Sequence, residues 1–148
     1  MSIEIPKYNI DELLNELKPY QRNELEKLLK SNNPIDAAKI WLSAKGADTT
    51  IAFGGKKDSH KLWDNFIVEF NKFICDDEEY TDNKNDIKKE MPISKELLIS
   101  IISSSIATQL GYPAIFISPA VVLVLFTVGK MTKNAYCATY YLNDPKKI

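Results

Sequence analysis

The chain has few of the residues from which catalytic and metal sites are usually built. Among its 148 residues there are one histidine, His60, two cysteines and five glycines. A metal site with several histidine ligands is therefore excluded, and His60 is best explained as a surface or capping residue. Gly54 and Gly55 are adjacent, whereas a phosphate-binding loop needs the spacing GxxxxGK[ST]. We expect no catalytic residue, no metal ion and no cofactor.

Arginine and net charge are also scarce. Arg22 is the single arginine beside 18 lysines, and the formal net charge is -1. Arginine is the side chain that best makes paired hydrogen bonds to phosphates and guanines. A binding partner made of nucleic acid is therefore not expected.

Charge is absent from residues 97–129, a run of 33 residues. Gly111, Pro113 and Pro119 divide this run, so it predicts one helix from Ser94 to Leu110 and a second from Ser118 to about Tyr140. Each uncharged piece is short for the roughly 30 Å of hydrocarbon in a bilayer. We therefore expect a helix hairpin in a protein core. A hairpin that inserts into a membrane is the alternative.

The rest of the pattern predicts an all-α protein, a single compact bundle of about six helices in one domain, 1–148. Asn9, Pro19 and the pair Asn33-Pro34 are helix start signals, and Gly46 is expected to end the third helix. The domain divides into three short helices at 1–45, a Gly-Gly loop at 46–57, an amphipathic helix at 58–75, an acidic polar segment at 76–92, and the central apolar hairpin at 93–142.

The two cysteines, Cys75 and Cys137, lie 62 positions apart and in no metal-binding spacing. Both fall in predicted helices beside apolar residues, so we expect buried free thiols. The N-terminus shows no basic region followed by an apolar stretch. These observations favour a cytoplasmic protein, with membrane association as the alternative.

A well-patterned helical core without a catalytic constellation predicts a non-enzymatic interaction or adaptor module that binds another protein or itself. A membrane-active protein using residues 97–129 is the alternative function. The candidate partner contacts lie in the two predicted connections: Phe53, Gly54, Gly55 and Lys56 in the first, and Tyr80 in the second.

One combination of features resembles small helical modules of bacterial conflict or defence operons. These features are the Gly-Gly loop, the aromatic helix that ends at Cys75, and the apolar Ser-Pro helix that ends in Asn134-Ala135-Tyr136-Cys137. The resemblance implies an accessory component of such a system, and it assigns no role to any residue.

Overall fold

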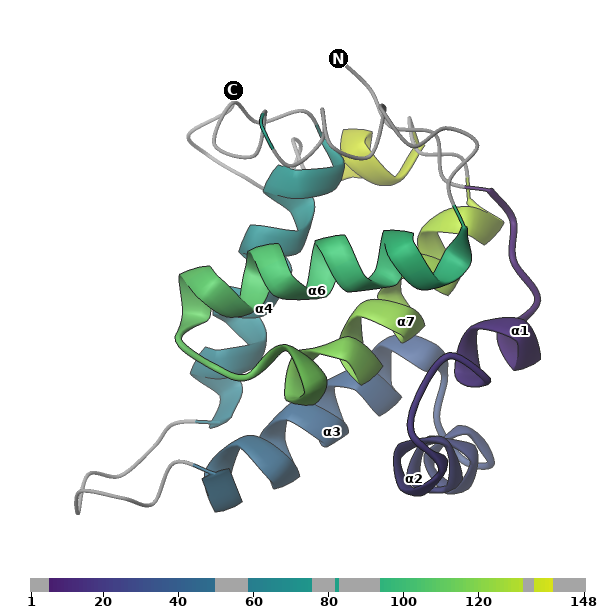
Figure 1. The fold of residues 1–148 in the computed structure, drawn as a ribbon, viewed down its shortest axis with the longest axis vertical. Helices are drawn as coiled ribbons and strands as arrows, with labels where there is room; N and C mark the ends of the chain where they lie inside the picture. The colour runs from purple at the N-terminus through teal and green to yellow at the C-terminus, as the bar shows by residue number, and fades with distance from the viewer. Residues whose placement is uncertain (1–5, 50–58, 76–81, 83–93, 132–134, 140–148) are drawn as a thin grey trace.

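The helices pack against one another as an all-α bundle, as the sequence predicts (Figure 1). The computed structural model describes residues 6–49, 59–75, 82, 94–131 and 135–139, and it describes no side chains for 44–49 and 59–61. Helix α7 (Ala114–Lys130) lies between α3 (Pro34–Thr49) and α6 (Lys95–Leu110), and it packs most extensively against these two helices. Helix α4 (Ser59–Ile74) packs against α3 and α6.

Most predicted helix starts are confirmed. Helix α1 (Ile10–Leu14) begins with a capping box, in which the Asn9 side chain accepts from the Asp11 backbone and Glu12 accepts from the Asn9 backbone. Helix α2 (Pro19–Leu29) begins on its proline, and the Asn33 side chain accepts from the Asp36 backbone N–H at the start of α3.

The predicted end of the third helix is wrong, because α3 continues through Gly46 to Thr49. A glycine inside a helix costs about 1 kcal/mol relative to alanine. The residues on either side of Gly46, Lys45 and Ala47, are good helix formers, so the glycine does not stop the helix. The predicted loop therefore begins later than residue 46.

The amphipathic helix and the first helix of the hairpin match their predictions. In α4 the side chains of Phe66, Phe70 and Phe73 are fully buried. The hydroxyl of Ser94 caps α6 by accepting from the Leu97 backbone, and Gly111 ends this helix with a φ of +75°. Glycine adopts that left-handed conformation without strain.

Helix α7 is the centre of the bundle. Every residue from Pro119 to Leu125 is buried, which confirms the predicted central position of the apolar hairpin formed by α6 and α7. The 17 residues of α7 cover about 25 Å. None of the helices in the described part of the chain is both long enough and apolar enough to cross a membrane.

The predicted start of the second hairpin helix is wrong. Helix α7 begins at Ala114 rather than at Ser118, so Pro119 lies inside it. A proline has no N–H for the carbonyl four residues earlier, which here belongs to Ile115. The Gln21 side chain donates to that carbonyl at 2.7 Å, and the Trp41 indole N–H donates to the next carbonyl, of Phe116, at 2.9 Å.

The Gln21 hydrogen bond satisfies the carbonyl that Pro119 leaves without its helical donor, so the helix tolerates its proline. Gln21 is buried, and its side-chain oxygen accepts from the Lys18 backbone N–H while its amide nitrogen donates to Ile115. One side chain therefore connects the first turn of α2 to the first turn of α7. A buried carbonyl without such a donor would cost about 1–3 kcal/mol.

The predicted continuation of the second hairpin helix to Tyr140 is also wrong. Helix α7 ends at Lys130, Met131 has an extended backbone, and a separate helical segment covers 135–139. The chain of Pro6 crosses the end of α7 so closely that a Cβ at Gly129 would lie 2.6 Å from the Pro6 carbonyl oxygen. Only glycine allows this approach without a shift of the backbone.

Candidate functional site

The candidate partner contacts predicted from the sequence lie outside the described residues. They are Phe53, Gly54, Gly55, Lys56 and Tyr80. The structure therefore does not test them, and they remain predictions. The backbone of His60 lies in the first turn of α4, as expected.

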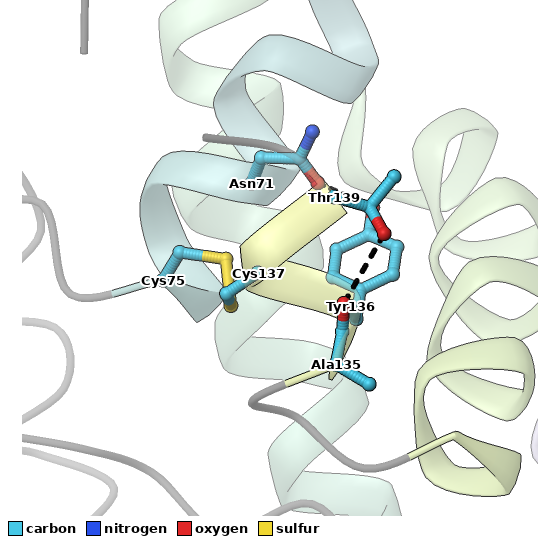
Figure 2. Close-up of a disulfide and its surroundings, with 6 residues drawn as sticks. All are labelled: Asn71, Cys75, Ala135, Tyr136, Cys137 and Thr139. Carbon is cyan, nitrogen blue, oxygen red and sulfur yellow. Dashed lines mark hydrogen bonds between the residues drawn. A yellow bond between two sulfur atoms is a disulfide. The ribbon is translucent and has the colours of Figure 1, made fainter. Parts of the chain in front are cut away.

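The two cysteines are bonded to each other, which corrects the prediction of free thiols. Cys75 follows the last turn of α4, and Cys137 lies in segment 135–139, with 5.6 Å between their Cα atoms (Figure 2). Both side chains are buried, so the predicted burial is correct. The predicted helix continued past Lys130 to Tyr140, whereas α7 ends at Lys130 and Cys137 lies in a separate segment that packs beside Cys75.

The disulfide is accompanied by contacts between the same two segments. The Tyr136 hydroxyl donates a hydrogen bond to the Asn71 side-chain oxygen, and the Tyr136 ring meets the Phe70 ring edge-on at 6.4 Å. Figure 2 shows Asn71 and Tyr136 beside the disulfide. Asn71 is buried, and its side-chain oxygen accepts the bond from Tyr136 of segment 135–139.

An apolar groove lies between the start of α3 and the end of α7. It has a volume of about 360 Å³, and Pro34, Ile35, Phe126 and Met131 provide its apolar surface. Ile35 and Phe126 are half-buried against the core, while Met131 keeps 41% of its surface exposed. We call this feature the Met131 groove.

The rim of the Met131 groove carries one charge of each sign. Asp36 is hydrogen-bonded to Asn33. Lys130 lies with its ammonium nitrogen 5.3 Å from the centre of the Phe126 ring, and it forms no ion pair with any residue that the structure describes. Lys130 is thus the charged group at this groove that remains available for an acidic partner.

No protein-family model, curated protein or solved structure matches this chain. In the described residues no three side chains of histidine, cysteine, aspartate or glutamate lie close enough together to hold a metal ion.

The Met131 groove has no signature in the local sequence. A second hairpin helix that continued to Tyr140 would include Met131, whereas the helix ends at Lys130. Pro6 approaches Gly129 closely at this end of the helix. The two residues are far apart in the sequence, so no local pattern predicts their contact.

Proposed function

We propose that this chain is a non-enzymatic interaction module that binds another protein through the Met131 groove. The observation that carries this proposal is the exposed Met131 beside a groove whose lining is mainly apolar. Exposed apolar surface is stabilised when a partner covers it. Methionine suits such a role because its flexible side chain adapts to the surface it meets.

The charge beside the groove specifies the partner further. Lys130 has no ion pair within the described part of the chain, and it lies over Phe126 at the edge of the groove. A partner segment that places an apolar side chain in the groove and an acidic residue beside Lys130 matches both features. The proposed partner is therefore a protein surface with that pair of residues.

The proposal is tested by photo-crosslinking at two exposed apolar positions. A photoreactive amino acid replaces Met131 in one protein and Val68 in the control, since Val68 is 42% exposed on α4. We expect position 131 to capture a distinct protein that position 68 does not capture. Capture of a second copy of this chain at position 131 would instead identify the groove as a self-association site and overturn the proposal.

The captured protein is then purified and its binding measured with variants. Met131→Ser and Lys130→Glu are each expected to weaken the complex at least about ten-fold, because hot-spot contacts of this kind contribute about 1.4 kcal/mol or more. Val68→Ser serves as the matched control and should leave the affinity unchanged. Equal affinities for all three variants would exclude the Met131 groove as the binding surface.

The disulfide supports a proposal about the compartment. Disulfide bonds persist in oxidising compartments and are rare in the cytosol, so the paired Cys75 and Cys137 favour an oxidising compartment over the cytoplasm predicted from free thiols. To test this, cells are quenched with acid and the protein is denatured and alkylated without reductant, because buried thiols react slowly in the native fold. Labelling of both cysteines would restore the cytoplasmic alternative, whereas labelling only after reduction would support the disulfide.

The burial of α7 supports an interaction module over a membrane-active protein. Residues from Val121 to Leu125 have no exposed surface, so insertion of 97–129 into a bilayer would require the core to open. Sedimentation with liposomes tests this alternative, because an inserting protein would pellet with the vesicles. An accessory role in a bacterial conflict or defence system stays a hypothesis.

A further inference from the structure

A second groove lies on another part of the surface, where α6 meets the first turns of α2 and α7. It has a volume of about 450 Å³, which is within the usual range for small-molecule sites. Four serines line it: Ser100, Ser103 and Ser104 from α6, and Ser118 from α7. We call it the serine groove.

Ser103 differs from the other buried or half-buried serine and threonine hydroxyls of α6 and α7. The hydroxyls of Ser105, Ser118 and Thr127 each donate to the carbonyl four residues earlier, at 2.7, 2.8 and 3.1 Å. Ser103 is 1% exposed, and its hydroxyl has no hydrogen-bond partner among the described residues. Buried polar atoms are almost always satisfied, so an unpartnered hydroxyl in the wall of a groove indicates a missing partner.

The start of two helices adds positive potential to the same groove. Pro19 is the first residue of α2 and Ala114 is the first residue of α7, and both line the groove. The helix dipole makes the start of a helix attractive to anions. Pro19 has no N–H, and Phe116 and Ile117 bond to the Pro113 carbonyl, so the N–H groups without a helical partner are those of Tyr20 and Gln21 in α2 and of Ala114 and Ile115 in α7. Lys18, which precedes α2, adds a full positive charge.

Negative charge lines the groove as well. Glu16 and Glu96 are part of its lining, and neither forms an ion pair with any residue in the described part of the chain. An anion with several charges would be repelled by these carboxylates, and a simple cation would be repelled by Lys18 and the helix starts. A ligand that carries one charge of each sign satisfies both sets of groups.

We propose that the serine groove binds a small zwitterion with one carboxylate and one ammonium group, such as a free amino acid. The Ser103 hydroxyl donates to the ligand carboxylate, which also interacts with Lys18 and the helix starts. Glu16 and Glu96 interact with the ligand ammonium. Leu17 and Ile99 provide apolar contacts for an aliphatic side chain. This site is separate from the Met131 groove and does not depend on it.

The experiment is a titration of the isotope-labelled full chain with each of the free L-amino acids, followed by nuclear magnetic resonance. Binding is expected to move the amide signals of Ser103, Ser104 and Ile115. The best amino acid is then compared with its amide, which lacks the carboxylate, and with its N-acetyl form, which lacks the ammonium. Each blocked form should bind at least about ten-fold more weakly.

Variants separate the proposed contacts from effects on folding. Ser103→Ala and Glu96→Gln are each expected to weaken binding about ten-fold. Ser105→Ala is the matched control, because its hydroxyl lies in the same helix and already bonds to Ile101. The proposal is overturned if no amino acid binds below about 10 mM, if the blocked forms bind equally well, or if Ser105→Ala weakens binding as much as Ser103→Ala.

Discussion

The two ends of α7 are fixed in different ways. At its N-terminal end, side chains from α2 and α3 donate to backbone carbonyls beside Pro119: Gln21 to Ile115 and Trp41 to Phe116. At its C-terminal end, the backbone of Pro6 passes directly over Gly129. The chain that follows α7 is tied to α4 through the Cys75–Cys137 disulfide.

This difference shows how an uncharged helix is placed precisely in a core. Burial of apolar side chains is strong but non-directional, so it favours many registers of α7 almost equally. The hydrogen bonds to the Ile115 and Phe116 carbonyls fix the N-terminal end of α7. Hydrogen bonds are directional, so they form only when these two carbonyls lie opposite Gln21 and Trp41. At the other end, a covalent bond and a close backbone contact limit where the chain can go.

The largest effect is expected from removal of the disulfide. The variant Cys75→Ala with Cys137→Ala should lose about 2–4 kcal/mol of unfolding free energy, because the cross-link no longer restricts the unfolded chain between two cysteines 62 positions apart. Urea denaturation measures this loss. The wild-type protein in reductant should approach the variant, while the variant itself should not respond to reductant.

A smaller effect is expected from Gly129→Ala. The new Cβ would lie 2.6 Å from the Pro6 carbonyl oxygen and 3.4 Å from the Lys7 Cα, so the N-terminal segment must move. We expect a loss of about 1–3 kcal/mol in urea denaturation, together with faster tryptic cleavage after Lys7.

Gly111→Ala is the matched control for this prediction. Position 111 has a φ of +75°, but a methyl group added there would meet no atom within 4 Å, so its cost of about 1 kcal/mol is backbone strain alone. Cleavage after Lys7 should therefore stay at the wild-type rate in this variant. Equal acceleration in both variants would show that the loss of stability, and not the contact with Pro6, exposes the segment.

The sequence predicted the features of the fold that depend on local chemistry. Asn9, Asn33 and Ser94 accept from backbone N–H groups at helix starts, and each does so from within three residues. The spacing of the aromatic residues in α4 likewise predicted its buried face. These features need no knowledge of distant parts of the chain, because the interacting groups are neighbours in sequence.

Apart from the end of α3, where the helix continues through Gly46, the errors involve contacts between distant residues. Ser118-Pro119 has the local pattern of a helix start, but Gln21, 94 positions away from Ile115, makes an earlier start favourable. The disulfide and the approach of Pro6 to Gly129 are equally long-range. Both grooves are formed by helices that meet in space, so the sequence alone did not reveal them.

The smallest effect, and the most specific, is the coupling energy between Gln21 and Pro119 in α7. Gln21→Leu removes the donor to the Ile115 carbonyl and the acceptor for the Lys18 N–H, so we expect a loss of about 1–3 kcal/mol. Pro119→Ala supplies a backbone N–H four residues after Ile115, which bonds to that carbonyl. In this background Gln21→Leu should cost about 1 kcal/mol less, as measured by a double-mutant cycle in urea.

Pro113→Ala is the matched control for this cycle, because Pro113 precedes α7 and is exposed. An N–H at position 113 cannot bond to Ile115, so its coupling to Gln21→Leu should be close to zero. If Pro119 and Pro113 give the same coupling, Gln21 stabilises the protein by packing alone. If Pro119→Ala alone shows coupling to Gln21→Leu, the buried glutamine supplies the hydrogen bond that the proline cannot donate. That hydrogen bond then fixes the N-terminal end of α7.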